Sequence, residues 1–190
     1  MTDDGTSKTG GKRRGQRREK RLPPPLGADS LRELALRYVG RYATTEAKLV
    51  RYLTRKVRER GWAEGEQRPD MAAVATMFAE RGYLSNRLYG EMKARSLAAR
   101  GYGEKRVSQQ LRADGLGEED RSAALNEIDA RAALTKFARR KRIGPFAREA
   151  ADRDTERKQF VACLRAGHGF DLVKELFSAE SAEAFEGAED

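Results

Sequence analysis

Residues 79–116 read AERGYLSNRLYGEMKARSLAARGYGEKRVSQQLRADGL, and this stretch decides the fold that the chain is expected to adopt. In it, glycine ends an amphipathic helical run three times, at Gly82, Gly101 and Gly115. Glycine after a helix supplies the left-handed conformation of a C-terminal cap, and the apolar residue beyond it packs back on the last turn. The stretch therefore predicts short helices joined by tight turns.

A glycine followed by a large apolar residue also recurs at a fixed interval. The pairs Gly61-Trp62, Gly115-Leu116 and Gly169-Phe170 stand 54 residues apart each time. Self-similarity at a fixed period is the sequence signature of repeat architectures. The interval predicts three copies of one helical unit.

Apolar residues at helical spacing predict three helices in each unit. Ser30 and Glu33 form a capping-box pattern that is expected to start the first helix. Thr45 is placed to cap the second helix, and Pro69 precedes the third. No segment alternates between apolar and polar residues as a strand would. The predicted fold is all-α, an elongated, curved array of three tandem three-helix repeats that cover residues 29–84, 85–129 and 130–178.

The two ends of the chain differ in composition from its centre. Residues 1–28 hold eight basic and three acidic residues, include the basic run Lys12–Arg21 and contain a triple proline. We expect a disordered basic N-terminal tail there, with the prolines as a stiff spacer. Residues 179–190 hold five acidic residues and no basic one, and are expected to form a frayed or disordered acidic tail.

Composition excludes several classes of protein. No window of 18 apolar residues occurs, and no apolar run follows the basic N-terminus, so neither a membrane span nor a secretory signal is expected. The single cysteine, Cys163, rules out an internal disulfide and a cysteine-cluster zinc site, and its helical context predicts a small buried residue.

Residues suited to catalysis are scarce. His168 is the only histidine, and its position between two glycines predicts a plain turn residue rather than a base or a metal ligand. Acidic pairs such as Glu118 and Glu119 stand at predicted helix starts, where favourable interaction with the helix dipole explains them. The segment Gly101-Tyr102-Gly103 follows no strand, so a dinucleotide-binding loop is not supported. We expect no enzyme, no cofactor and no metal site.

Basic residues are the remaining functional signal in a chain whose net charge is +9. Excess positive charge indicates a polyanionic partner, and arginine at this density suits phosphates or rows of acidic side chains. Each residue alone is equally well explained by a charged solvent face, but the set predicts a contact surface. Its members are Lys93, Arg95, Arg100, Lys105, Arg106 and Arg112 around the central turn, and Arg139, Arg140, Lys141 and Arg142 at the end of a later helix.

From about Leu31 to Phe177 the sequence resembles the RecX family, the bacterial modulators of the RecA recombinase. The segments with the resemblance are Ala79–Leu84, Arg95–Gly103 and Val107–Leu116. The motif positions within and between them are Gly82, Tyr83, Leu84, Tyr89, Gly101, Tyr102, Val107, Leu111 and Gly115.

The chain departs from the family pattern in places. Ser85-Asn86-Arg87 stands where acidic residues usually follow the first motif, and Gly90 stands where the family has alanine. The third unit matches poorly, since residues 142–155 form an unusual linker that contains Gly144-Pro145.

The resemblance implies an all-helical, non-enzymatic cytoplasmic protein, acting as a monomer without a cofactor. It implies a partner, the RecA nucleoprotein filament, in whose groove the chain would lie, with possible direct contact to single-stranded DNA. It further implies that the chain limits filament growth, ATP hydrolysis, strand exchange and co-protease activity. The basic residues of the second and third units are then the expected contacts.

Two other hypotheses remain open. A basic helical DNA-binding protein would hold phosphates with its tail and Arg139–Arg142, with steep salt dependence and little effect of RecA. An enzyme would need a site built from carboxylates and lysines alone. A requirement for the filament, rather than for naked DNA, distinguishes a RecA modulator from the DNA-binding protein.

Overall fold

The computed structural model describes residues 24–187, which contain helices, turns and one isolated bridge but no β-strand. The all-α prediction is therefore confirmed for these residues, while the basic run Lys12–Arg21 lies outside them. The elements in chain order are α1 (Ala28–Arg41), α2 (Glu46–Arg60), α3 (Met71–Glu80), α4 (Asn86–Ala98), α5 (Glu104–Ala113), α6 (Glu118–Leu125), α7 (Ala130–Lys141), the 3-10 turn η1 (Gly144–Phe146), α8 (Arg153–Arg165), α9 (Phe170–Ser178) and α10 (Ala182–Glu186).

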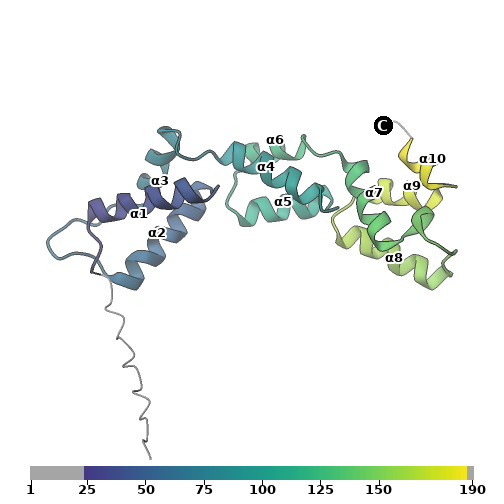
Figure 1. The fold of residues 1–190 in the computed structure, drawn as a ribbon, viewed down its shortest axis with the longest axis horizontal. Helices are drawn as coiled ribbons and strands as arrows, with labels where there is room; N and C mark the ends of the chain where they lie inside the picture. The colour runs from purple at the N-terminus through teal and green to yellow at the C-terminus, as the bar shows by residue number, and fades with distance from the viewer. Residues whose placement is uncertain (1–23, 188–190) are drawn as a thin grey trace, which may run out of the picture.

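The helices form three groups, each with its own cluster of buried apolar side chains. α1 to α3 enclose the first cluster, α4 to α6 the second, and α7 to α10 the third. Figure 1 shows the three groups one after another along the longest axis, so the described chain is elongated rather than globular. That the groups are copies of one repeat remains a prediction.

The first group shows how the sequence pattern produces the packing. Leu31 and Ala35 on α1 stand four residues apart, as do Leu49 and Leu53 on α2, and all four are buried. Residues four apart share one face of a helix, so the two helices turn these faces toward each other. Phe78 on α3 completes the cluster.

Two predicted helix starts have different outcomes. Thr45 caps α2 as expected, because its Oγ1 accepts a hydrogen bond of 3.1 Å from the backbone N–H three residues on. Ser30 does not cap α1, which begins at Ala28 behind Gly27. The prediction is wrong because Ser30 is the third residue of the helix and its Oγ accepts from the Gly27 N–H at 2.9 Å, the role that the pattern assigned to Glu33.

The folded part of the chain begins earlier than predicted. Leu26 is fully buried in the first cluster. Its N–H donates to the Gly61 carbonyl at 3.0 Å, and its carbonyl accepts from the Ala63 N–H at 2.9 Å. The expectation that the disordered tail extends to residue 28 is wrong for residues 24–28, because one buried leucine with two backbone hydrogen bonds fixes them to α1 and α2.

The segment after α9 packs against the third cluster. α10 places Phe185 there with 1% exposure. Arg131 on α7 donates to Glu175 on α9 at 2.7 Å and to the Phe185 carbonyl at 3.0 Å. The prediction of a frayed or disordered acidic tail is wrong for residues 179–187, because an aromatic anchor, the hydrogen bond from Arg131 and an ion pair between Glu186 and Arg139 on α7 outweigh the repulsion among its acidic side chains.

Of the three glycines spaced 54 residues apart, two end a helix as predicted and one does not. Gly61 and Gly115 follow helices and have positive φ values of 81° and 92°. Gly169 instead precedes α9 with φ −66°, and the apolar residue after it, Phe170, is 56% exposed. The helix-ending role expected at the third position, Gly169, is wrong because the turn after α8 takes its left-handed residue earlier, at Gly167 with φ 95°.

Cys163 on α8 is fully buried, as predicted. Burial raises the pKa of its thiol to about 11, so the thiolate is scarce at neutral pH. Within residues 24–187, no helix has both the length and the apolar character needed to cross a lipid bilayer.

We expect Phe185→Ala to lower the free energy of unfolding by about 3 kcal/mol, because it removes a buried aromatic ring and leaves a cavity. Urea unfolding followed by circular dichroism measures the change. Phe170→Ala, which truncates an exposed phenylalanine of the same group, is the matched control and should have a much smaller effect. Equal stability of the two variants would show that α10 does not pack in solution.

Candidate interaction surface and the joints that shape it

The first joint connects the first and second groups and is formed by Thr45, Lys48, Tyr89 and Asp114. Thr45 donates from its Oγ1 to the Asp114 carbonyl at 2.7 Å, so the residue that caps α2 also binds the end of α5. The Tyr89 hydroxyl donates to Asp114 Oδ2 at 2.6 Å. Lys48 Nζ lies 2.9 Å from the same oxygen and also donates to the Tyr89 hydroxyl. Asp114 is buried, and the ammonium group of Lys48 balances its negative charge inside the joint.

The pKa values at the first joint follow from these contacts. Burial would raise the pKa of Asp114, but hydrogen bonds from Tyr89 and Lys48 outweigh it and hold the pKa below its ordinary value of 3.8. Burial likewise would lower the pKa of Lys48, yet hydrogen bonds with Tyr89 and Asp114 raise the pKa above 10.5. Both groups are therefore charged across the neutral range.

A close approach of the two groups lies beside these polar contacts. Gly115 has a positive φ, and a Cβ built on it would lie closer than 3.0 Å to the Cβ of Ala47 on α2. Only a residue without a side chain lets α2 come this near to the turn after α5. Gly115 therefore ends α5, as predicted from the sequence, and also allows close contact between the first and second groups.

The second joint connects the second and third groups through backbone atoms. The Gly103 N–H donates to the Ala166 carbonyl at 3.0 Å, and the Lys105 N–H donates to the Gly167 carbonyl at 3.1 Å. A Cβ on Gly103 would lie closer than 3.0 Å to the backbone of Gly167, so glycine is required for the two turns to meet. The start of α5 is thus held directly against the turn between α8 and α9.

His168 lies in that turn, as predicted, and is also part of the second joint. Its side chain is only 2% exposed, its Nε2 lies 3.2 Å from the Gly101 carbonyl, and its ring packs on Phe137 with centroids 5.5 Å apart. Burial lowers the pKa of His168, although the hydrogen bond to Gly101 acts in the opposite direction. The imidazole therefore functions as a neutral packing element of the joint.

The four basic residues at the end of α7, Arg139–Arg142, are of two kinds. Arg139 makes a bidentate ion pair with Glu186 of α10, at 2.6 and 2.8 Å. Arg140 donates to the Arg100 carbonyl, and its guanidinium lies 5.7 Å from the Phe137 ring centroid, so it belongs to the second joint. The other two predicted contacts in this run are exposed and make no ion pair within the described part of the chain: Lys141 and Arg142.

The cluster around the central turn is only partly engaged. Arg95 lies 3.7 Å from Glu127, and Arg106 stacks 4.9 Å from the Tyr102 ring centroid. Lys93 is half-buried. The remaining predicted contacts expose their side chains without an ion pair among residues 24–187: Arg100, Lys105 and Arg112.

The motif residues mainly maintain the architecture. Val107 and Leu111 are fully buried in the second cluster, and Leu84 is buried in the first. Tyr102 is half-buried against the second cluster, as expected for a turn anchor. Tyr83 is half exposed, with its ring 5.4 Å from that of a phenylalanine on α3. Gly82 and Gly101 have positive φ, as their predicted helix-ending role requires.

Sequence reasoning missed the partners within the joints. Thr45 and Asp114 lie 69 positions apart in the chain, and no local pattern links them. It also placed the contact surface only on the second and third units, whereas α1 and α2 line a basic groove of their own. Among the described residues, no group of three or more acidic, histidine or cysteine side chains is placed to hold a metal ion.

This geometry defines an extended helical array held in shape by two polar joints. Regulatory protein RecX of Myxococcus xanthus (strain DK1622) is 32% identical over 180 residues, which cover 90% of this chain and 94% of the relative. A crystal structure of regulatory protein RecX has the same fold, with a TM-score of 0.58 and 17% identity over 78% of this chain and 72% of that one. No protein-family model matches the chain. At this identity and coverage, the chain belongs to the RecX family of regulatory proteins.

We expect Asp114→Asn to lower the free energy of unfolding at pH 7 by about 2 kcal/mol, because it leaves Lys48 without a charged partner in the joint. Asp29→Asn, which changes an almost fully exposed carboxylate in an ion pair on α1, should cost less than about 0.5 kcal/mol. Urea titrations of the wild type and both variants measure the difference.

The same pair of variants has a defined pH dependence. Because the folded-state pKa of Asp114 lies below 3.8, its stabilisation is complete above that value and is lost as the pH falls through the lowered pKa. The gap between wild type and Asp114→Asn should therefore narrow on acidification. A gap that is constant with pH would contradict a stabilising role for the carboxylate charge.

Gly103→Ala should lower the free energy of unfolding by about 2 kcal/mol, because its Cβ has no space against the Gly167 backbone. Gly117→Ala is a close control, since Gly117 also precedes a helix with a similar φ, but nothing lies near its added Cβ. Small-angle scattering should show a changed distance distribution only for Gly103→Ala. Identical behaviour of the two variants would contradict a tight second joint.

Proposed function

We propose that this chain regulates RecA by lying along the groove of RecA–single-stranded DNA filaments, where it limits filament growth, ATP hydrolysis, strand exchange and co-protease activity. Membership in the RecX family supports this proposal. The elongated array of Figure 1 also supports it, since three groups in a row match a partner that repeats along an axis. We further propose that it acts as a cytoplasmic monomer and is not an enzyme.

The length of the array provides the physical basis for this proposal. Each helical group can contact a different protomer of a filament, and the first contact raises the effective concentration of the others. The array gains most from this effect if its spacing is fixed, because a mobile array loses conformational entropy on binding. The two joints, one through Asp114 and one through Gly103, supply that fixed spacing.

Contacts within the protein make two of the proposed contact residues less accessible to a partner. Arg139 and Arg140 already make contacts within the protein, Arg139 a bidentate ion pair with Glu186 and Arg140 one hydrogen bond to the Arg100 carbonyl. A partner would have to displace these contacts to use the two arginines. The better candidates are therefore the predicted contacts that are exposed and have neither an ion pair nor a ring contact among the described residues, namely Arg100, Lys105, Arg112, Lys141 and Arg142.

The alternative is a basic DNA-binding protein that acts without RecA. Such a protein would compete for phosphates, and its effect on RecA would require enough copies to coat the DNA. A filament modulator instead acts when it is far less abundant than RecA. Stoichiometry therefore separates the two functions.

We expect the chain to inhibit the DNA-dependent ATPase of RecA on single-stranded DNA at well below one copy per RecA protomer. The variant Lys141→Glu/Arg142→Glu should raise the concentration needed for half inhibition about tenfold, because it reverses two exposed charges at the proposed contact. A steady-state ATPase titration provides the measurement.

The control for this variant is Arg32→Glu/Arg81→Glu, which makes the same change in net charge on the first group. It should inhibit nearly as well as the wild type. Inhibition that begins only when the DNA is coated, or an equal loss in both variants, would refute the filament proposal and favour simple competition for phosphates.

A further inference from the structure

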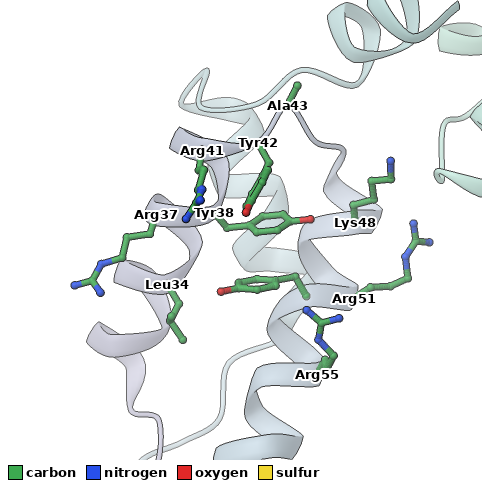
Figure 2. Close-up of a pocket in the computed structure, with 10 residues that line it drawn as sticks. Leu34, Arg37, Tyr38, Arg41, Tyr42, Ala43, Lys48, Arg51 and Arg55 are labelled. Atoms are coloured by element: carbon green, nitrogen blue, oxygen red, sulfur yellow. The ribbon is translucent and has the colours of Figure 1, made fainter. Parts of the chain in front are cut away.

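A basic groove of about 850 Å³ lies between α1 and α2, outside the contact surface expected from the sequence. No carboxylate lines it. Figure 2 shows the Tyr38 ring between the two helices, with Arg37 extending from α1 and Arg51 from α2. The lining residues of this α1–α2 groove are mainly basic and aromatic, and those that matter here are Arg37, Arg41, Arg55, Tyr38, Tyr42 and Tyr52.

The tyrosines form a stacked platform within the groove. The rings of Tyr38 and Tyr52 are parallel within 11°, with centroids 4.1 Å apart. Both pack against the first buried cluster, so the core accounts for them. Tyr42 differs, because it lies beyond the end of α1, is 49% exposed and tilts over Tyr38 at 5.4 Å. Packing against the first buried cluster therefore does not account for Tyr42, because about half of this residue is exposed to solvent.

Cations accompany these rings. The Arg41 guanidinium lies 5.5 Å from the Tyr42 ring centroid, and that of Arg55 lies 5.8 Å from Tyr52. Arg41 has no ion pair with any residue between 24 and 187. Arg37 and Arg55 pair with glutamates on their own helices, at 3.2 and 3.6 Å, but each pair is an exposed single contact and therefore weak, unlike the bidentate pair of Arg139. All three arginines are thus available to an anion.

The α2 side of the groove also includes cations that are already engaged. Lys48 binds Asp114 in the first joint. Arg51 donates to the carbonyls of Ala113 and Asp114 at 3.4 and 3.5 Å, which are long hydrogen bonds. These two residues raise the local positive potential without being needed as direct ligands.

We propose that the α1–α2 groove binds single-stranded nucleic acid, with one base stacked on Tyr42 and neighbouring phosphates held by Arg37, Arg41 and Arg55. A cationic groove with an exposed aromatic face is the arrangement that sequence-tolerant single-strand binding uses. An acidic peptide would satisfy the arginines but would leave the ring face unused. The site needs no RecA, so it stands or fails independently of the proposed filament function.

The test uses fluorescence anisotropy with a short labelled oligothymidylate and an abasic oligonucleotide of equal length, without RecA. For each variant, the ratio of the two affinities isolates base stacking from charge, and any general loss of fold cancels. The variants are Tyr42→Leu, Tyr42→Phe and Arg41→Ala, with Arg32→Ala as the control for charge on the same helix.

Tyr42→Leu should bind oligothymidylate about tenfold more weakly, as expected for the loss of one base–aromatic stack, and should bind the abasic strand as the wild type does. Tyr42→Phe should keep the wild-type ratio. Arg41→Ala should weaken binding to both strands and reduce the salt slope by about one, more than Arg32→Ala does.

An unchanged affinity ratio in Tyr42→Leu would overturn the stacking site. Equal effects of Arg41→Ala and Arg32→Ala would overturn the phosphate contacts. Displacement of the oligothymidylate by oligoglutamate of matched charge, as effective as displacement by unlabelled oligothymidylate, would show that the groove takes acidic peptides instead.

Discussion

The array depends on a buried carboxylate. Each helical group encloses only a small apolar cluster, and the clusters do not merge into one core. Apolar packing alone therefore does not fix how the first group sits on the second. Asp114 does so, because its carboxylate accepts from Tyr89 and Lys48 while its carbonyl accepts from Thr45. Such contacts have directions that apolar contacts lack, and a buried charge with one partner removed is costly. The first joint therefore favours one arrangement of the groups.

The two joints lie at opposite ends of one helix. α5 starts directly after Gly103, in the second joint, and ends directly before Asp114, in the first. It has ten residues, so the joints stand about 15 Å apart along its axis. Its inward face, Val107 and Leu111, is fully buried in the second cluster, which prevents α5 from shifting between its two ends. The length of α5 thus sets the spacing of the outer groups.

The sequence predicted the helices well and the joints poorly, for one physical reason. Helical periodicity and turn glycines are local signals, and Gly82, Gly101 and Gly115 do adopt positive φ. The joints pair residues far apart in the chain, and nothing near Asp114 indicates that Thr45 and Lys48 will reach it. Local composition also led to a wrong prediction at one place, where a single tertiary contact orders a segment of polar and acidic residues. The acidic segment before residue 187 appears in sequence as a tail, yet Phe185 is buried in the third cluster.

The positive charge of the chain is a poor guide to its contacts, because part of it serves the protein itself. Arg140 binds a backbone carbonyl in the second joint and Arg139 binds α10, so neither is readily available to a partner. The cations that remain available are spread along the array, in the α1–α2 groove, at Arg100, Lys105 and Arg112 of the second group, and at Lys141 and Arg142 at the end of α7. If the chain binds a filament as proposed, two such sites act together only if the distance between them matches the spacing of their contacts on the filament. On that proposal, the affinity of the whole chain depends on α5 and its joints, although neither joint needs to touch the partner.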